Sequence, residues 1–353
     1  MIYSRFLEGL PGYFGGKQKL VKRIISCFNK GDNFTVVDAF CGGGSVSLWS
    51  KLNNYRVISN DHQYLSYQIQ KSFIENNCIK LTKEDVLRLF NYLKQVNIKE
   101  LPNYNKCQEL FVLDQHARFV CGASYLVNKI NVFKNEHKKS LFNILISRYC
   151  SLIRPYQNFT SSLNKKIMDN VNTKQSYEIN SSSIKKTNLL LTNSLDLALN
   201  VMDRINKSVF NNGHKNECYN LDVFSFLNNI NNMHLANTIL YLDPPYYGCE
   251  SYEHYYLPIT NILLCENGNQ KQNISVFNLK DYKTFFENLL TNSLKFNRLV
   301  ISYAGKATES IIKLVEKYRK IEIIKIPVHY SVSGKDVVGC EYIIIGDELI
   351  KCQ

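Results

Sequence analysis

Short apolar runs rich in β-branched residues recur along the chain, and amphipathic segments separate most of them. A buried strand reads as a run of about four to eight such residues, whereas an amphipathic helix repeats its apolar positions every three or four residues. The strand-like runs cover residues 34–40, 56–60, 238–243, 298–303, 321–328 and 340–346, with a weaker candidate at 217–222. The helical patterns include residues 17–29, 62–76, 279–291 and 307–318. This alternation predicts an α/β fold with a mostly parallel sheet covered on both faces.

The alternation stops between about residues 78 and 215. Helical patterns at 83–96 and 109–129 are followed by a polar stretch rich in Ser, Asn and Lys. We interpret the first part as a small helical subdomain and the second as flexible loops of the kind that order on a ligand. A second polar loop is expected at 265–275. The predicted organisation is a discontinuous domain, 1–77 and 216–353, interrupted by an insertion at 78–215.

Composition adds a strongly basic balance, because 43 Lys and Arg against 30 Asp and Glu give a net charge of +13. Such an excess favours a polyanionic partner, with nucleic acid first and an anionic membrane surface second. The alternative is a merely Lys- and Asn-rich chain from an AT-rich genome. The 11 cysteines include no C-x-x-C pair, so neither a zinc site nor a disulfide framework is expected. No apolar run reaches the roughly 20 residues of a membrane helix, and no secretory signal opens the chain, which together predict a cytoplasmic protein.

A glycine-rich turn follows the first strand in "VVDAFCGGGSVSLW". It places Gly42, Gly43 and Gly44 before a helix that is expected to begin near Ser45. Asp61 ends the next strand about twenty residues later, where a carboxylate can accept both hydroxyls of a ribose. The alternative is a plain tight connection between strand and helix. A dinucleotide fingerprint would carry a third glycine where this chain has Ser47, so an adenosine moiety is favoured over a dinucleotide.

A second unusual stretch, "ILYLDPPYYG", ends the strand that begins near residue 238. Asp243 stands at the strand end, and Pro244 and Pro245 hold the backbone in a stiff, extended turn. Tyr246 then offers a flat ring. A planar base with an exocyclic amine could stack on this ring and donate its N–H groups to the Asp243 side chain and the Pro244 carbonyl. Stacking alone would tolerate Phe or Trp at position 246, and the alternative is an ordinary Pro-Pro turn with a surface tyrosine.

Three motifs occur along the chain in the order "GYFGGKQKLVKRI", "DAFCGGGS" and "DPPY". With these motifs, the chain resembles the Dam-like DNA adenine N6-methyltransferases (D12 class, alpha group). The resemblance extends from about Gly9 to Glu348 and is weakest across residues 134–215. The resemblance implies a Rossmann-like S-adenosylmethionine-dependent methyltransferase fold with a mixed, mostly parallel seven-stranded sheet. It also implies direct methyl transfer from S-adenosylmethionine to the N6 amine of a flipped-out adenine in double-stranded DNA. Neither a covalent enzyme intermediate nor a metal is needed for that reaction.

The resemblance further implies roles for individual residues. The target adenine would be held by Asp243, Pro244, Pro245 and Tyr246. The cofactor would be bound by Tyr13 and Lys17 in the pocket lining, Asp38, Phe40, Gly42 and Gly44 around the methionine part, Asp61 at the ribose, Asp222 with Val223 or Phe224 at the adenine, and Asp243. Ala39 replaces the family's usual proline, and Lys335 and Glu341 match its last loop and strand loosely.

The insertion would be the DNA target-recognition domain. Residues 117–133 resemble the family's recognition segment only in part, so base-reading residues stay unassigned. The candidates for phosphate contacts, each of which could also be an ordinary solvated charge, are Lys129, Lys134, Lys138, Lys139, Arg148 and Arg154. The protein would act in restriction-modification beside a companion restriction endonuclease, or as an orphan methylase, and as a monomer or weak dimer.

Three other readings stay open. The first keeps the fold and changes the target to cytosine N4 or to adenine in RNA, although the acid at position 243 favours adenine in DNA. The second is a methylase-like DNA-binding regulator without activity, against which Asp243 and Asp61 argue. The third is a dehydrogenase.

Overall fold

The computed structural model describes residues 6–13, 15–31, 34–111, 113–153, 192–230, 237–248, 252–266, 281–332 and 335–350. The polar stretch expected to form flexible loops and most of the loop at 265–275 lie outside these residues. The chain forms two compact units. One comprises Gly15–Gln70, Asn211–Tyr252 and Gln272–Gln353, and the other Met1–Phe14, Lys71–Phe210 and Glu253–Lys271.

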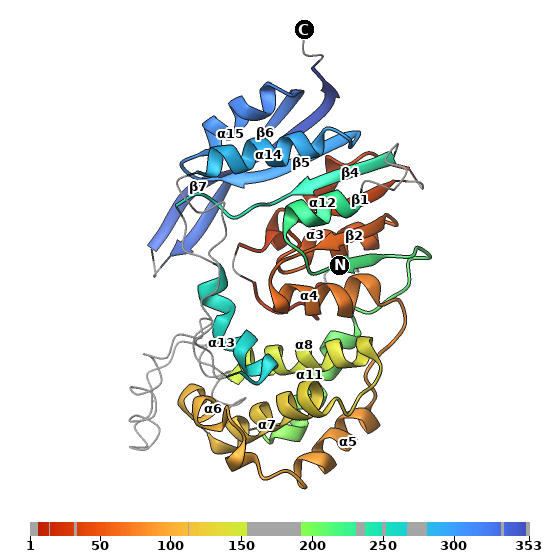
Figure 1. Ribbon diagram of the computed structural model, residues 1–353, viewed down its shortest axis with the longest axis vertical. Coiled ribbons are helices and arrows are strands. Elements are labelled where there is room, and N and C mark those ends of the chain that lie inside the picture. Colours follow the sequence, from red (N-terminus) through yellow and green to blue (C-terminus); the bar gives the residue numbers. More distant parts are fainter. Residues whose placement is uncertain are drawn as a thin grey trace. The chain divides into compact units, whose positions relative to one another are not determined.

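The first unit is built on one seven-stranded sheet with the order β3-β2-β1-β4-β5-β7-β6 (Figure 1). The first five strands of the chain run parallel, while β7 is antiparallel to both β5 and β6. The predicted α/β fold with a mixed, mostly parallel seven-stranded sheet is therefore confirmed. The strands are β1 (Thr35–Asp38), β2 (Arg56–Asn60), β3 (Glu217–Tyr219), β4 (Thr238–Leu242), β5 (Arg298–Ala304), β6 (Arg319–Val332) and β7 (Lys335–Leu349).

Helices cover both faces of this sheet, and the apolar run of each central strand explains why. Side chains of a strand alternate between the two faces, so a strand that is buried throughout, such as β4, must be covered on both. Val37, Leu240 and Leu299 point into a core shared with α12, α14 and α15. On the other face, Phe28 at the end of α2 packs against Tyr241 of β4. The helices of this unit are η1 (Lys17–Lys19), α2 (Val21–Ser26), α3 (Ser45–Leu52), α4 (Tyr64–Gln70), α12 (Val223–Asn229), α14 (Tyr282–Ser293) and α15 (Thr308–Glu316).

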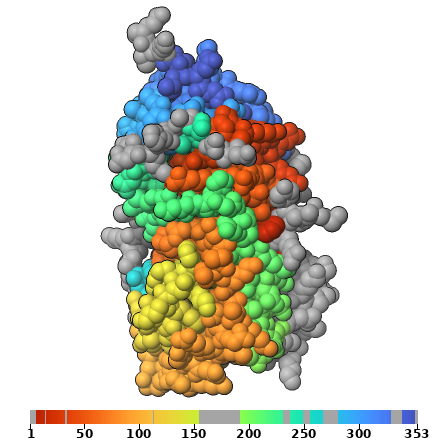
Figure 2. Space-filling model, turned by 90° about the vertical axis from the view of Figure 1, so that its right-hand side faces the viewer, coloured from red at the N-terminus to blue at the C-terminus, as the bar shows by residue number. Residues whose placement is uncertain are grey.

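The described part of the second unit is helical. Thr82 caps α5 with a reciprocal pair of hydrogen bonds to Asp85, which satisfies backbone donors that a helix start leaves open. In the space-filling view of Figure 2, the light orange and yellow surface is formed by residues of this unit. The elements are η2 (Lys71–Glu75), α5 (Lys83–Leu93), η3 (Ile98–Glu100), α6 (Tyr104–Leu110), α7 (Asp114–Tyr125), η4 (Leu126–Ile130), α8 (Glu136–Ile153), α11 (Ser194–Asn206) and α13 (Tyr252–Leu264).

The boundaries expected near residues 78 and 215 fall close to those between the two units, at Lys71 and Phe210. The helical unit also includes Met1–Phe14 and Glu253–Lys271, which no local sequence pattern assigns to it. None of the described helices is both long and apolar enough to cross a membrane.

Candidate active site

Acidic side chains gather at the carboxyl edge of the sheet. The strands β1 to β4 are parallel, so their carboxyl ends meet at one edge. Asp38 closes β1, while Asp61 and Asp243 directly follow β2 and β4. The antiparallel β7 adds Glu341 at the same edge, because this residue pairs with Ala304 at the carboxyl end of β5. The sheet thus brings together acids that lie up to about 300 residues apart in the sequence.

The glycine turn between β1 and α3 has the backbone that its sequence predicts. Gly42 and Gly44 have φ angles of 50° and 76°, a region that glycine occupies without the strain of a side chain. Asp61 fastens this turn to β2, since its carboxylate accepts from the Gly42 amide at 2.7 Å and from the Gln63 amide at 2.8 Å. The residue predicted to hold a ribose therefore also shapes the turn.

Asp38 is a buried acid, with only 1% of its surface exposed. It accepts from the Ser47 hydroxyl at 2.7 Å and from the Phe40 amide at 3.3 Å. Burial raises the pKa of Asp38 to about 7, and the negative charges of Asp243 and Asp61 add to the rise, while the two hydrogen bonds oppose it. Near neutral pH, this edge of the sheet therefore gains stabilisation from any positive charge that binds beside it.

Asp222 lies three residues after the end of the short strand β3 and caps α12. Its Oδ1 accepts from the amides of Phe224 and Ser225, and hydrogen bonds at Ser225 are the main reason that the pKa of this carboxyl is lowered. Val223 is buried in the core, whereas Phe224 is half-buried and lies near Phe285, with ring centroids 6.3 Å apart. Of the two candidates for packing on a ring, Phe224 is the more exposed.

The Asp-Pro-Pro-Tyr corner meets a buried lysine. The Lys17 ammonium lies 3.0 Å from Oδ1 of Asp243 and 3.6 Å from Oε1 of Glu341. It also donates to the Tyr246 hydroxyl at 2.8 Å and to the Gly15 carbonyl at 3.2 Å. The Tyr246 hydroxyl in turn donates to Glu341. Lys17, Asp243, Glu341 and Tyr246, which we call the corner network, are thus mutually connected.

Titration within the corner network follows from burial and charge. The pKa of Asp243 is raised to about 6, mainly by burial; the Lys17 ammonium lowers it, and the charge of Glu341 raises it. Burial opposes the charged form of Lys17 as well, but the charges of Asp243 and Glu341 outweigh burial and raise the pKa of that ammonium. Lys17 is therefore charged at neutral pH, and Asp243 is mostly ionised.

Aromatic packing fixes the end of the corner. The rings of Tyr246 and Tyr303 lie 4.8 Å apart at an angle of 55°, and the Tyr303 hydroxyl accepts from the Tyr247 amide at 2.9 Å. Tyr247, to which the sequence assigns no role, stacks on Tyr282 of α14 with centroids 4.4 Å apart. The second tyrosine thus anchors the corner to a helix that covers the sheet.

The remaining predicted residues, apart from Lys335, belong to the helical unit. Tyr13 stacks on Tyr256 of α13, with centroids 4.5 Å apart. Lys138 forms an ion pair with Asp85 at 2.8 Å. The other phosphate-contact candidates differ in surroundings: Lys129 and Lys134 are exposed, Lys139 is half-buried, Arg148 is half-buried and donates to the Leu10 carbonyl, and Arg154 lies outside the described residues. Lys335 opens β7, but its side chain is likewise outside the described part.

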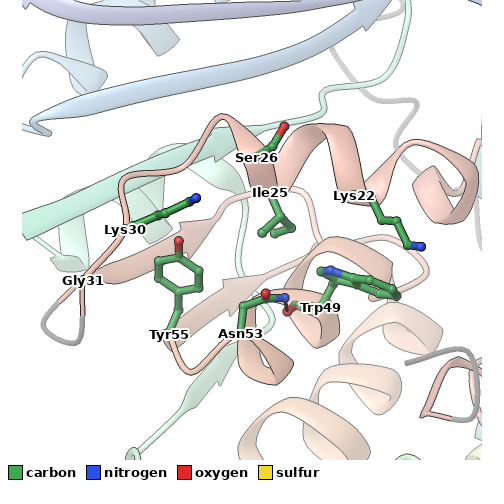
Figure 3. Close-up of a pocket in the computed structure, with 8 residues that line it drawn as sticks. All are labelled: Lys22, Ile25, Ser26, Lys30, Gly31, Trp49, Asn53 and Tyr55. Atoms are coloured by element: carbon green, nitrogen blue, oxygen red, sulfur yellow. Dashed lines mark hydrogen bonds between the residues drawn. The ribbon is translucent and has the colours of Figure 1, made fainter. Parts of the chain in front are cut away.

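A cavity of about 350 Å³ lies at the opposite edge of the sheet (Figure 3). Tyr55, which precedes β2, and Gly31, which precedes β1, place it at the amino ends of these strands. Trp49, Lys22 and Lys30 also line it. It contains none of the predicted site residues, so the candidate active site is at the carboxyl edge.

Sequence reasoning missed two contributors to the site. Ser47, noted only because it is not a glycine, donates to the buried Asp38. Glu341 was matched only loosely, yet it is buried and bonds both Lys17 and Tyr246. The signal for Glu341 was available, since an acid at the start of the apolar run "CEYIIIG" is buried only when it has partners. Among the described residues, no group of three or more His, Cys, Asp or Glu side chains is placed to hold a metal ion.

Comparison with known proteins agrees with this geometry. Residues 13–319 match the family described as D12 class N6 adenine-specific DNA methyltransferase. Type II methyltransferase M2.HphI of Haemophilus parahaemolyticus is 26% identical over 329 residues, which cover 92% of this chain and 93% of that protein. Type II methyltransferase M.FokI of Planomicrobium okeanokoites is 26% identical over 270 residues, 69% of this chain but 36% of that protein. With the family matched across most of its length, this chain belongs to the D12 class N6 adenine-specific DNA methyltransferases, as its motifs predict.

Proposed function

We propose that this adenine-specific DNA methyltransferase takes its methyl group from S-adenosylmethionine and delivers it to N6 of an adenine rotated out of double-stranded DNA. The observation that carries the proposal is the meeting of Asp243, Pro244 and Tyr246 with the acids and the glycine turn at one sheet edge. The groups that can accept from an amine, and the Tyr246 ring on which a base can stack, thus lie beside the glycine turn, which is suited to a nucleoside.

The residues at this edge fit the proposed cofactor. Its sulfonium is a cation, and Asp38 and Asp243 are acids whose pKa values are raised to about 7 and about 6 by burial. Such acids bind a cation with favourable energy because it relieves the cost of their ionisation. Because Gly42 and Gly44 have no side chains, the methionine part of the cofactor could lie close to the backbone of this turn. When bound, S-adenosylmethionine supplies an electrophilic methyl group, and the chain supplies orientation.

The corner residues have complementary tasks toward adenine. The ionised Asp243 and the Pro244 carbonyl accept the two N–H bonds of the amine, which orients the nitrogen and favours its lone pair for attack. Leaving the base stack costs a few kcal/mol. Stacking on the Tyr246 ring contributes roughly 1–3 kcal/mol and offsets part of that cost. The proton that methylation leaves on the amine passes to the ionised Asp243 carboxylate, which has a pKa of about 6 and therefore releases it to solvent at neutral pH.

We also propose that the helical unit reads the DNA sequence. Its exposed Lys129 and Lys134 suit phosphate contacts, for which we expect an affinity that falls steeply with salt. Because both relatives are named type II methyltransferases, a restriction-modification role beside a companion endonuclease is favoured over an orphan methylase. We propose that the protein is a monomer or weak dimer.

The proposal is tested with the Asp243→Ala variant, which keeps Lys17 paired with Glu341. Methylated nucleosides from DNA treated with each protein are identified by mass spectrometry, and binding of labelled S-adenosylmethionine is measured by equilibrium dialysis. We expect N6-methyladenine from the wild type, none from the variant, and cofactor binding that is weakened but not lost, because Asp38 and the glycine turn remain. Asp203→Ala, an exposed position on α11, is the control and should behave as wild type. An active Asp243→Ala protein, or methylation of cytosine, would exclude this mechanism.

A further inference from the structure

The Lys17 ammonium is unusual because this single positive charge is buried between two carboxyl groups, whose combined negative charge exceeds its own. Its side chain is only 5% exposed and lies between Asp243 and Glu341. Glu341 is equally buried, whereas the Asp243 side chain keeps 18% of its surface open. Burying charges is costly unless each is paired and hydrogen-bonded, so this arrangement must be held firmly by the fold. Asp243 is also the more exposed of the two acids, and therefore the one a substrate can reach.

The Tyr246 hydroxyl has more partners than a stacking platform needs. A tyrosine hydroxyl has one proton to donate and can accept from other donors. Here it donates to the Glu341 carboxylate, whose oxygens lie at 2.9 and 3.0 Å, and accepts from Lys17 at 2.8 Å. Together with the neighbouring Tyr303 ring, these bonds fix both the position and the tilt of the Tyr246 ring.

We propose that Glu341 and Lys17 are positioning residues, which hold the Tyr246 ring through its hydroxyl and the Asp243 carboxylate through the ammonium. This inference rests on the proposed function and extends it to residues that touch neither the base nor the methyl group in that scheme. If Tyr246 acted by stacking alone, Phe would be tolerated at position 246. The positioning role predicts instead that Tyr246→Phe lowers the rate of methylation. A ring without its hydroxyl leaves Glu341 and Lys17 each short of one partner.

The two positioning residues act on Asp243 in opposite electrostatic senses. Lys17 favours the ionised carboxylate, and Glu341 disfavours it. The other groups that face the site are the Tyr246 hydroxyl, which favours ionisation of Asp243, and Asp38 of β1, whose charge interacts with that of Asp243. Tyr241 of β4 stays neutral in this range, because burial raises the pKa of its hydroxyl well above the usual value. Methylation requires ionised Asp243, so its rate should rise with pH through about 6 in the wild type. Glu341→Gln should move this rise to lower pH, and Lys17→Met should move it to higher pH.

The experiment measures single-turnover methylation of a DNA duplex with saturating S-adenosylmethionine across this pH range for the wild type, Glu341→Gln, Tyr246→Phe and the double variant of these two changes. The pH profile of Lys17→Met is measured in the same way. We expect the single-turnover rate of methylation to fall on the order of 10- to 100-fold in Glu341→Gln and in Tyr246→Phe, because a small misplacement of the reacting base lowers the rate strongly. Cofactor affinity should stay within about twofold, since the positioning contacts act on the base side. The double variant should be no slower than Tyr246→Phe, because that variant has already lost the hydroxyl whose bond to residue 341 the Glu341→Gln change weakens.

Several results would overturn the inference. These are an unchanged rate in Glu341→Gln, multiplicative losses in the double variant, or pH profiles that move in the same direction for Lys17→Met and Glu341→Gln. Glu322→Gln, the same change at an exposed position of β6, is the matched control and should leave rate and profile unchanged. Tyr246→Phe retains the whole ring, so it tests the inference even where Glu341→Gln folds poorly. If the wild type itself formed no N6-methyladenine, the proposed function would fail instead.

Discussion

Replacing Asp38 with Asn should stabilise the sheet unit at alkaline pH, although it removes a residue of the candidate site. Asp38 is 1% exposed, and its partners are the Ser47 hydroxyl and the Phe40 amide. An Asn side chain has nearly the shape of the protonated acid and keeps one oxygen that can accept one of these bonds. The substitution therefore removes a buried charge while changing the packing little.

The magnitude follows from the pKa of Asp38. Its value is about 7 in the folded protein, raised by burial from an ordinary 3.8. Because the folded state binds the proton more tightly, stability is greatest below the ordinary value and falls as pH rises through about 7. At about 1.4 kcal/mol for each pH unit, the full cost in the alkaline range is on the order of 4 kcal/mol. Between about pH 5 and 8.5, the loss of stability caused by ionising Asp38 grows by roughly 2–3 kcal/mol. The Asp38→Asn variant avoids this loss because Asn does not ionise.

The assay is urea denaturation without added cofactor at these two pH values, followed by fluorescence of Trp49. This residue is the sole tryptophan of the chain and lies on α3 two residues after Ser47, so it reports on the unit that contains Asp38. The free energy of unfolding of Asp38→Asn, relative to wild type, should rise between pH 5 and 8.5. Ser47→Ala, which removes a bond that favours the ionised acid, should instead lose more stability at pH 8.5. A stability difference for Asp38→Asn that is the same at both pH values would refute the reasoning.

Three other changes have defined outcomes. Lys51 is fully buried and its pKa is lowered by burial to about 7, so Lys51→Met should raise the free energy of unfolding most below pH 7 and least toward pH 10, as measured by urea denaturation. Arg319→Met should lower that free energy by at least about 3 kcal/mol, because the guanidinium is 1% exposed and donates to backbone carbonyls that include those of Ser293 and Phe296. Gly44→Ala should cost about 1–2 kcal/mol at its φ of 76° and weaken S-adenosylmethionine binding in calorimetric titration.

Much of the sheet could be predicted because its strands are buried on both faces. A fully buried strand such as β4 has a continuous apolar sequence that stands out from its surroundings. The hairpin of β6 and β7 was predicted only in part, at 321–328 and 340–346, whereas the strands span Arg319–Val332 and Lys335–Leu349. The additional length is maintained by pairing between the two strands and has no apolar run to reveal it.

The site likewise contains residues that the local sequence predicts and residues that only tertiary contacts bring in. The positions of Asp38, Asp61 and Asp243 followed from strand ends, because parallel strands present their carboxyl ends at a common edge. The partners of these acids depend on tertiary contacts that no local pattern encodes. Lys17 is 229 residues from Tyr246, and Glu341 is 95 residues from it, so their bonds to its hydroxyl could not be derived from spacing.

The charge distribution explains how a basic protein could serve the proposed cationic cofactor and a polyanionic substrate at once. The net charge of +13 attracts DNA, whereas the carboxyl edge holds Asp38, Asp61, Asp243 and Glu341 beside the buried ammonium of Lys17. At physiological ionic strength, exposed charges are screened over about 8 Å, while buried charges are screened much less. The buried acids therefore act strongly on a sulfonium at the edge and weakly on a phosphate at a distance. Were Asp38 and Glu341 exposed, the same acids would repel DNA, so their burial is what makes the two requirements compatible.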